Sequence, residues 1–337
     1  MPPQPKVRVL AHFAPGPRVR ERVARESDWL DVRWCPEVPA ADDALRRELP
    51  EADVIWHMLR PLTAADLDSA VRLRLIQKFG SGVNTIDVAA ATRNGVAVAN
   101  MPGANAASVA EGTVLLMLAA MRRLVSLDRA TRAGRGWPSD PALCEHVRDI
   151  GSCTVGLVGY GNVARSVERM VSAMGASVLH TSTTDDSTPG WRPLNELLAA
   201  SDIVSLHLPL SASTHHLIDS AALAAMKPTA VLVNTARGAI IDEAALSAAL
   251  RDGGLAAAGL DVFEDEPTPA DNPLLGLDNA VCTPHVSWCT VDTMDRYLEQ
   301  AITNCRRLAA GGQPTGVVNE PANPDKAATA TSRGVRA

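Results

Sequence analysis

The chain lacks the features that mark membrane proteins, exported proteins and nucleic-acid-binding proteins. Its longest apolar stretch, Val114–Met121, is far too short to span a bilayer. No basic start with an apolar run behind it follows Met1, so no export signal is evident. The formal net charge is -6, and Lys and Arg form no clustered stripe, which argues against a nucleic-acid partner. We therefore expect neither a membrane nor nucleic acid as a partner.

The cysteines lack the spacing of a disulfide framework. None belongs to a C-x-x-C pair, and without an export signal we expect free thiols in a reducing cytoplasm at Cys35, Cys144, Cys153, Cys282, Cys289 and Cys305. Cys282, His285 and Cys289 are close enough in sequence to suggest metal ligands. Closed zinc sites need four ligands, however, and no fourth ligand stands at a suitable spacing. The sequence therefore predicts no metal site.

What the chain does contain is a repeated alternation of strand-like and helix-like segments. With 337 residues and 46% apolar content, it is long enough for two domains with cores of their own. In the first part, helix-like stretches such as Ala41–Glu48, Ala64–Ala70 and Asp87–Arg93 separate five expected strands, which are Val7–Phe13, Asp31–Trp34, Asp53–Met58, Leu73–Phe79 and Val96–Asn100. This order is typical of a doubly wound α/β domain.

A second alternating set follows residue 103. One long helix is expected at Ala106–Arg132, where Ala, Leu and Met are frequent, before a segment with Gly and Pro ends it. Strand-like segments then recur from Val155 to Cys282, and a last helix is expected at Val291–Leu308. Residues 321–337 show no periodicity and are expected to be disordered.

The segment Gly159-Tyr-Gly161-Asn-Val-Ala164 has the G-x-G-x-x-A spacing of a dinucleotide-binding turn. The apolar run Val155–Val158 before it indicates a strand, and Asn162–Met174 indicates an amphipathic helix. Gly159 permits the tight turn, Gly161 lets the backbone approach a pyrophosphate, and Ala164 packs the helix on the sheet. The helix N-terminus offers free N–H groups to the phosphates. Strand, turn and helix together predict a dinucleotide cofactor.

The choice between NAD and NADP depends on the end of the next strand, where an acid binds the adenosine ribose of NAD. The expected strand Ser177–His180 leads into Ser182 and Thr183 instead. Hydroxyl groups without a carboxylate leave room for a 2′-phosphate and modestly favour NADP. No arginine follows directly, and Asp185 and Asp186 would repel a phosphate if they pointed inward, so both cofactors stay open.

Three charged or titratable side chains stand just after expected parallel strands of the second set. They are Arg237, Glu266 and His285. The C-terminal ends of such strands hold the ligands of open α/β sheets. The guanidinium can hold a carboxylate, the imidazole can move a proton near neutral pH, and the acid can orient and tune the imidazole. We predict that these three are catalytic, against the alternative of ordinary surface charges at loop starts.

Together these motifs resemble the D-isomer-specific 2-hydroxyacid dehydrogenase family, which includes phosphoglycerate dehydrogenases, hydroxypyruvate/glyoxylate reductases and D-lactate dehydrogenases. The similarity runs from about Val7 to Val318 and includes the stretches Lys78–Asp87, Asn100–Gly103, Val109–Glu111 and Ser205–Thr214. It implies an NAD(P)-dependent oxidoreductase, a homodimer, that interconverts a small 2-oxo acid and a D-2-hydroxy acid.

The resemblance also implies the fold. It is an α/β fold of two doubly wound parallel-sheet domains, with a Rossmann-type cofactor domain inserted in a flavodoxin-like substrate domain. The substrate domain would comprise residues 1–103 and 289–320, and the cofactor domain residues 104–288. The disordered tail would comprise residues 321–337.

The resemblance further implies the roles of individual residues. Arg237 matches the substrate-binding arginine, Glu266 the acid that supports the histidine, and His285 the acid/base. The substrate carboxylate is expected on the turn formed by Ser81, Gly82 and Val83, with Arg60 as a further contact. The expected cofactor contacts are Gly159, Tyr160, Gly161, Asn162, Val163, Ser182, Thr183, His207, Pro209, Thr214, Thr235, Ala236 and Asp261.

Two positions depart from the pattern of the family. Ala106 stands where many members carry a threonine near the cofactor phosphate, so that contact is not expected. Trp288, in the string Pro284-His-Val-Ser-Trp288, is more familiar among hydroxypyruvate-reductase-like members and favours a small substrate. The alternatives are a phosphoglycerate dehydrogenase-like enzyme and an NAD(H)-sensing protein like the corepressors that share this fold.

A few further polar residues have more than one interpretation. His207 ends the expected strand Ile203–Leu206 and either faces the cofactor or is a satisfied strand-end histidine. His215 and His216 lie in a polar turn with no carboxylate or cysteine nearby in the sequence, and are expected to be solvated. Arg60 and Lys78 are expected on loops of the first domain, where they could hold a phosphate or a second anionic group.

Overall fold

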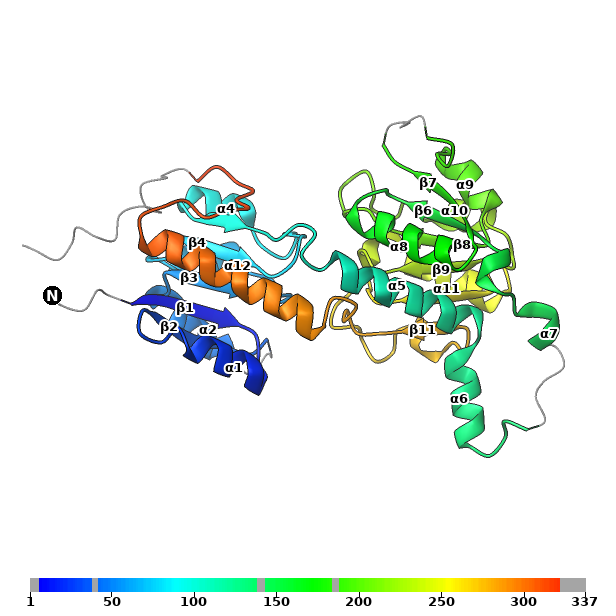
Figure 1. The fold of residues 1–337 in the computed structure, drawn as a ribbon, viewed down its shortest axis with the longest axis horizontal. Coiled ribbons are helices and arrows are strands. Elements are labelled where there is room, and N and C mark those ends of the chain that lie inside the picture. Colours follow the sequence, from blue (N-terminus) through cyan, green and yellow to red (C-terminus); the bar gives the residue numbers. More distant parts are fainter. Residues whose placement is uncertain (1–5, 38–41, 138–142, 184–187, 322–337) are drawn as a thin grey trace, which may run out of the picture. The chain divides into compact units, whose positions relative to one another are not determined.

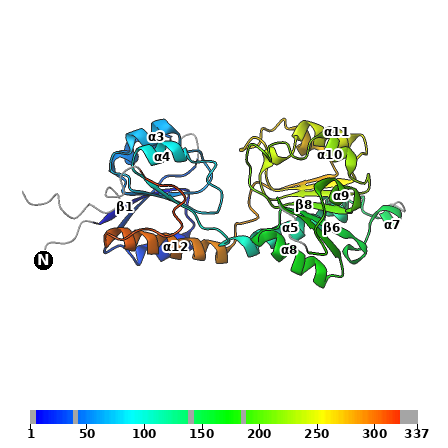
Figure 2. The same cartoon turned by 90° about the horizontal axis from the view of Figure 1, so that it is seen from above.

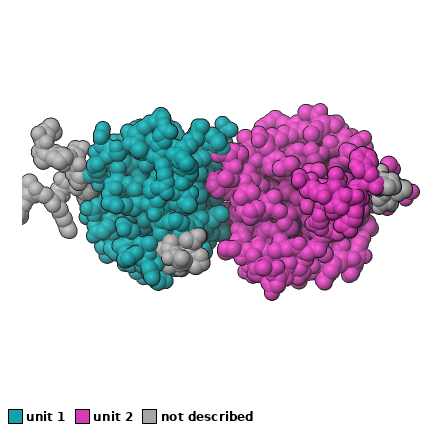
Figure 3. Space-filling model, turned by 90° about the horizontal axis from the view of Figure 1, so that it is seen from below, with its two compact units in different colours: residues 1–104, 291–337 teal, residues 105–290 magenta. Residues whose placement is uncertain are grey.

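The computed structural model of the chain describes residues 6–37, 42–137, 143–183 and 188–321. The chain forms two compact units, which Figure 3 shows in different colours. Unit 1 consists of Met1–Ala104 and Val291–Ala337, and unit 2 consists of Asn105–Thr290. Unit 2 is thus inserted into the sequence of unit 1. The tail expected at residues 321–337 lies, after Pro321, outside the described residues.

Unit 1 is built on a parallel sheet of five strands in the order β2-β1-β3-β4-β5. Its strands are β1 (Val7–His12), β2 (Leu30–Trp34), β3 (Val54–His57), β4 (Leu75–Lys78) and β5 (Ala97–Ala99). This is the flavodoxin-like order, in which the sheet grows outward in both directions from β1. The strands are rich in Val, Ile and Leu because both faces of the sheet are covered.

Helices cover both faces of the unit 1 sheet (Figure 2). The core on one face is formed with α2 (Asp42–Glu48), α3 (Ala64–Ser69), α4 (Val88–Arg93) and the 3-10 turn η2 (Leu49–Glu51). The other face carries α1 (Pro17–Ala24) and α12 (Val291–Ala309) (Figures 1 and 2). Tyr297 of α12 is buried and packs on Phe79, with ring centroids 5.5 Å apart. The C-terminal helix therefore completes the core of unit 1.

Unit 2 contains a second parallel sheet, in the order β11-β10-β9-β8-β6-β7. Its strands are β6 (Thr154–Val158), β7 (Ser177–Thr181), β8 (Ile203–Leu206), β9 (Val231–Asn234), β10 (Ala257–Leu260) and β11 (Ala280–Cys282). Trp191 adds an isolated parallel bridge to His180 in the edge strand β7. If this bridge is counted as a rudimentary third strand, the order is the Rossmann order extended by β11.

The unit 2 sheet is also sandwiched between helices. On one face, α5 (Ala106–Met121) and α8 (Asn162–Ala173) pack on a core that includes Val155, Leu157 and Val233. The opposite core, which includes Val204, Leu232 and Leu260, is covered by α9 (Leu194–Ala200), α10 (Ser220–Ala225) and α11 (Glu243–Arg251). The remaining short elements are α7 (Leu143–His146), η3 (Ile150–Ser152), η4 (Gly238–Ile240) and η5 (Pro273–Gly276).

The single helix expected at Ala106–Arg132 is two helices, so that prediction was wrong. The chain breaks after α5, and α6 (Leu124–Arg132) begins behind Arg123, whose φ of 51° is left-handed and incompatible with a continuous helix. Most of α5 is buried against the sheet, whereas α6 has no buried residue. The helix propensity of a sequence does not indicate where the packing of a helix on the sheet ends.

Although α5 holds the longest apolar run, no helix in the described ranges is long and apolar enough to cross a membrane.

The close contact at Gly238 gives a test of this fold. A Cβ added there would lie 1.8 Å from the backbone carbon of Phe263, which is fixed in the next loop. We expect Gly238→Ala to lower the free energy of unfolding by about 3 kcal/mol, measured by urea denaturation. Gly276→Ala is the matched control, because a Cβ there would meet no atom within 4 Å. Equal stability of the two variants would contradict this packing.

Candidate active site

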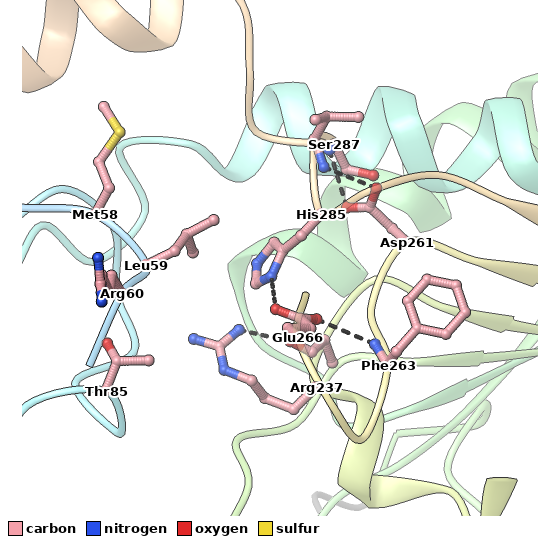
Figure 4. Close-up of polar contacts among 12 residues, drawn as sticks. Met58, Leu59, Arg60, Thr85, Arg237, Asp261, Phe263, Glu266, His285 and Ser287 are labelled. Atoms are coloured by element: carbon pink, nitrogen blue, oxygen red, sulfur yellow. Dashed lines mark hydrogen bonds and ion pairs between the residues drawn. The ribbon is translucent and has the colours of Figure 1, made fainter. Parts of the chain in front are cut away.

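The three residues predicted to be catalytic lie at one edge of the unit 2 sheet. Arg237 follows β9, Glu266 lies in the loop after β10, and His285 follows β11. These strands are neighbours in the sheet and parallel, so their C-terminal ends lie side by side. Figure 4 shows that the three side chains converge. The sheet therefore brings together residues that are 48 positions apart in the chain, from 237 to 285.

His285 and Glu266 form a directly bonded pair. The Nδ1 atom of His285 lies 2.7 Å from Oε2 of Glu266, and the side chains are 17% and 32% exposed. Burial raises the pKa of Glu266, but the hydrogen bond and charge of His285, the Phe263 N–H and the Arg237 charge together hold it below its usual value. Glu266 is therefore ionised at neutral pH and only accepts, so Nδ1 carries a proton. Proton exchange with a substrate is left to Nε2.

Arg237 is half-buried and is held by the turn that carries it. Its Nη1 donates to the carbonyl of Ala236 at 2.6 Å. Burial lowers the pKa of Arg237 and the nearby Glu266 charge partly offsets this, but a guanidinium stays protonated at neutral pH. The turn is shaped by buried Asn234, whose Nδ2 donates to the Arg237 carbonyl at 2.8 Å and whose Oδ1 accepts from the Ala236 N–H at 3.0 Å.

Asn234 was not singled out in the sequence, although a signal exists. An Asn at a strand end followed by a short polar turn is typical of a side chain that bonds its own backbone two residues on. The neighbouring Thr235, a predicted cofactor contact, shares a hydrogen bond of 2.8 Å with Thr113 of α5. The predicted contacts Thr235 and Ala236 thus lie on a turn that is fixed from both sides.

Asp261 fixes the position of His285. This carboxylate is 1% exposed, and it accepts from the Thr283 hydroxyl at 2.6 Å and from the Val286 and Ser287 N–H groups at 2.9 Å each. The N–H of His285 donates to the Asp261 carbonyl at 2.7 Å. These bonds hold His285 at a φ of 54°, a left-handed conformation that costs energy in a residue other than glycine. The sequence suggested a cofactor contact for Asp261 and missed this positioning role.

The glycine-rich turn after β6 has the shape that a pyrophosphate requires. Gly159 has a φ of 90°, and a Cβ there would lie 2.6 Å from the carbonyl oxygen of His207. At Gly161, by contrast, a Cβ would meet no atom within 4 Å, so the surface is open to a ligand. Asn162 and Val163 begin α8, whose first N–H groups have no partner within the helix. These residues fit a dinucleotide.

The predicted contact His207 lies at the start of the loop after β8, beside Gly159. Among the described residues its buried Nε2 atom has no hydrogen-bond partner. Burial lowers the pKa of His207 to about 3, so the ring is neutral and retains a polar atom for a ligand. The loop behind it is closed by Thr214, whose hydroxyl donates to the Pro209 carbonyl at 2.7 Å.

A stack of three side chains lies at the end of β7, where the cofactor ribose was expected. The ring of Tyr160 stacks on His180 at 3.7 Å, and the guanidinium carbon of Arg165 lies 4.6 Å from the centre of the Tyr160 ring. Ser182 and Thr183 follow β7 directly, whereas Asp185 and Asp186 lie outside the described residues. No arginine follows the strand directly in the sequence, but α8 brings Arg165 to this stack.

The predicted substrate-binding residues lie in unit 1. In the described part of the chain, the amides of Ser81, Gly82 and Val83 donate no backbone hydrogen bond. The Ser81 carbonyl accepts from Asn100 Nδ2 at 2.7 Å, which anchors the turn. Such unused amides suit a carboxylate.

Arg60 lies on a short segment after β3 that is held by hydrogen bonds to Glu37 and His57. The N–H groups of Leu59 and Arg60 donate to Glu37 Oε1 at 2.6 and 2.8 Å. His57 donates from Nε2 to the Arg60 carbonyl at 2.6 Å. Burial and the Lys78 ammonium hold the pKa of His57 well below its usual value, so this imidazole is neutral and structural.

Lys78 is not on a loop, contrary to expectation. It is the last residue of β4 and only 4% exposed. Its ammonium donates to the Met58 carbonyl and lies 3.4 Å from the Thr85 hydroxyl. Lys78 therefore links the two loops that follow β3 and β4, and it is not presented as an anion-binding side chain.

His216 is also not simply solvated. Its Nε2 lies 2.7 Å from Oε1 of Glu264, a residue 48 positions further along the chain. The Glu264 loop reaches it because β8, β9 and β10 end at the same edge of the sheet. Among the described residues, no group of three or more His, Cys, Asp or Glu side chains is placed to share a metal ion.

Comparison with known proteins assigns the chain to a family. Residues 114–287 match the profile described as "D-isomer specific 2-hydroxyacid dehydrogenase, NAD binding domain". The chain is 38% identical over 305 residues to the glyoxylate reductase of Aeropyrum pernix, with 87% of this chain and 91% of the relative covered.

Solved structures are similar over nearly the whole chain. The TT0316 protein of Thermus thermophilus has a TM-score of 0.84 and 34% identity, covering 93% of this chain and 100% of the other. An NADPH-dependent glyoxylate/hydroxypyruvate reductase of Sinorhizobium meliloti, in complex with NADP and malonate, has a TM-score of 0.79 and 29% identity, covering 94% and 99%. With both the profile and full-length relatives in agreement, this chain belongs to the D-isomer-specific 2-hydroxyacid dehydrogenase family.

Proposed function

We propose that this protein is an NAD(P)-dependent reductase of small 2-oxo acids of the glyoxylate or hydroxypyruvate type. The observation that carries the proposal is the bonded pair of His285 and Glu266 beside Arg237, at the sheet edge that also holds the glycine-rich turn. The relative from Aeropyrum pernix is a glyoxylate reductase, and the similar Sinorhizobium meliloti structure is a glyoxylate/hydroxypyruvate reductase.

In this proposal His285, Glu266 and Arg237 have different roles in the reduction of the carbonyl group. When bound, the reduced nicotinamide supplies a hydride to C2 of the 2-oxo acid. His285 donates the proton on Nε2 to the oxygen at C2, and takes it back in the oxidation of the 2-hydroxy acid. Glu266 stays ionised and stabilises the imidazolium through Nδ1. The guanidinium of Arg237 binds the substrate carboxylate and polarises the 2-oxo group.

We propose that unit 1 carries anion-binding groups of its own. The unused amides of Ser81, Gly82 and Val83 would receive a carboxylate, and Arg60 would hold a further anionic group. A cofactor-sensing protein would bind NAD(P)H without turnover, and a phosphoglycerate dehydrogenase-like enzyme would prefer the phosphorylated substrate. Steady-state assay of a panel of 2-oxo acids, with and without a phosphate group, separates these three activities.

The proton transfer can be tested at His285. We expect His285→Gln to lower kcat by about 10²-fold or more while cofactor binding stays nearly intact, because only the acid/base group is lost. Turnover is measured by nicotinamide absorbance, and cofactor binding by titration calorimetry. His146→Gln, at an exposed histidine of α7, is the control. A His285 variant with near wild-type turnover would remove this residue from the mechanism.

For the cofactor, we propose a modest preference for NADP over NAD. Ser182 and Thr183 offer hydroxyl donors without the carboxylate that would repel a 2′-phosphate. Arg165 stands over Tyr160 and can provide the positive charge that the sequence after β7 lacks. The expected contact set therefore accepts a phosphate better than it would with an acid at the strand end.

Ser182→Asp tests this preference. The new carboxylate should bind the ribose hydroxyls and repel the 2′-phosphate, so we expect the ratio of kcat/KM for NADPH over NADH to fall by about tenfold or more. Ser177→Asp places the same charge at the exposed, opposite end of β7 and should change the ratio little. A wild type that uses NADH far better than NADPH would overturn the preference.

We also propose that the protein is a homodimer that pairs through α6. Leu124, Val125 and Leu127 are 53%, 42% and 39% exposed, and no residue of α6 is buried. Figure 1 shows that α6 stands away from the body of unit 2. In a two-fold dimer the same patch lies on both subunits, so an apolar helix face can cover its own copy.

Leu124→Glu tests the dimer. A charge in the first turn of α6 is compatible with a helix but not with burial against a second apolar face, so we expect a monomer by sedimentation velocity. Val71→Glu, at a 66% exposed residue of unit 1, should leave the mass unchanged. A Leu124→Glu protein that sediments as a dimer would place the interface elsewhere.

A further inference from the structure

We propose that His216 is a positioning residue that couples the loop carrying Arg237 to the loop carrying Glu266. The inference rests on the proposed function for its kinetic consequence, but its geometry stands alone. The N–H of His216 donates to the Ala239 carbonyl at 2.9 Å, two residues beyond Arg237. Its Nε2 lies 2.7 Å from Glu264 Oε1, two residues before Glu266. One residue thus holds both loops.

The Glu264 carboxylate is the centre of a cluster of bonds. Besides His216, its Oε1 accepts from the Glu243 N–H at 3.2 Å, and the Glu264 N–H donates to Glu243 Oε1 at 2.5 Å. Glu243 Oε2 in turn accepts from Asn272 Nδ2 at 2.8 Å. Because a carboxylate at neutral pH only accepts, the His216 nitrogen acts as the donor. The imidazole therefore supplies an N–H to a site where two carboxylates lie close together.

The backbone of His216 shows that its position is imposed by the surrounding loops. Its φ is 50°, a left-handed conformation that costs energy for a residue with a side chain. The His216 and Glu264 side chains are 36% and 33% exposed, and pairs with such exposure stabilise a protein little. The stability that this hydrogen bond adds therefore does not account for the conformation. We infer that the conformation serves to position the imidazole.

The Glu264 loop transmits its position to both catalytic side chains. The Phe263 N–H donates to Glu266 Oε1 at 3.1 Å, on the carboxylate that bonds His285 through its other oxygen. The backbones of Gly238 and Phe263 are in direct contact, since a Cβ on Gly238 would lie 1.8 Å from the Phe263 carbonyl carbon. A shift of Glu264 therefore moves Glu266 away from His285 and disturbs the turn at Arg237.

Three substitutions test the coupling. Asn tolerates the left-handed backbone but is too short to reach Glu264, whereas the Gln amide reaches about as far as the His216 Nε2. We expect His216→Asn to lower kcat by about tenfold with little change in KM for the cofactor, and His216→Gln to retain most of the activity. His215→Ala, which removes only the stacked ring of the exposed neighbour, should behave as wild type.

A double-mutant cycle shows whether His216 acts through Glu266. In the Glu266→Gln background, His216→Asn should cost little further activity, because the group that it positions is already lost. A His216→Asn enzyme with wild-type kcat, or a full and additive loss in the Glu266→Gln background, would overturn the proposal.

Hydrogen exchange measured by mass spectrometry gives a readout that does not depend on turnover. The peptide spanning Asp261–Pro267 includes the Phe263 amide and should exchange faster in His216→Asn, but not in His215→Ala. If the wild type reduces no 2-oxo acid, the proposed function fails, while the exchange result still decides the coupling. Unchanged exchange in this peptide would show that His216 does not hold the loop.

Discussion

The geometry of the candidate active site depends on one buried carboxylate, that of Asp261. It accepts three hydrogen bonds from the turn that carries His285, while the Asp261 N–H donates to the Asn234 carbonyl at the end of β9. Burying a carboxylate costs free energy unless hydrogen bonds satisfy its oxygens. The turn can therefore adopt few other conformations without losing these hydrogen bonds. Asp261 therefore fixes His285, the proposed acid/base residue, to the same strand end that shapes the Arg237 turn.

The loops around this anchor share a common physical cause. Parallel strands end at one edge, so the loops that follow β8, β9, β10 and β11 begin close together there. Space is so limited that only glycine fits at Gly238, and both His216 and His285 adopt left-handed backbones. Strain of this kind persists where surrounding bonds determine the conformation, and such strain is concentrated at functional sites.

Unit 1 and unit 2 use similar sheets for different tasks. The β3 and β4 loops of unit 1 are held by a neutral His57 and a buried Lys78, whose bonds go to backbone and hydroxyl groups. The loops that follow β9, β10 and β11 of unit 2 bring a guanidinium, a carboxylate and an imidazole together at one edge of the sheet.

The sequence by itself determined the alternating strands and helices of both units, the glycine-rich turn and the strand-end positions of the three residues that we propose as catalytic. These features depend on local spacing, because strand period, turn glycines and strand-end positions are all encoded within a few residues. Tertiary structure decided the break at Arg123, the pairing of His216 with Glu264, the stack of Arg165 on Tyr160 and the bonds of Asp261. His216 and Glu264, and Asp261 and Val286, are far apart in the sequence and meet only because neighbouring strands end at one edge of the sheet. The break at Arg123 and the stack on Tyr160 are local, but they depend on where α5 and α8 pack on the sheet.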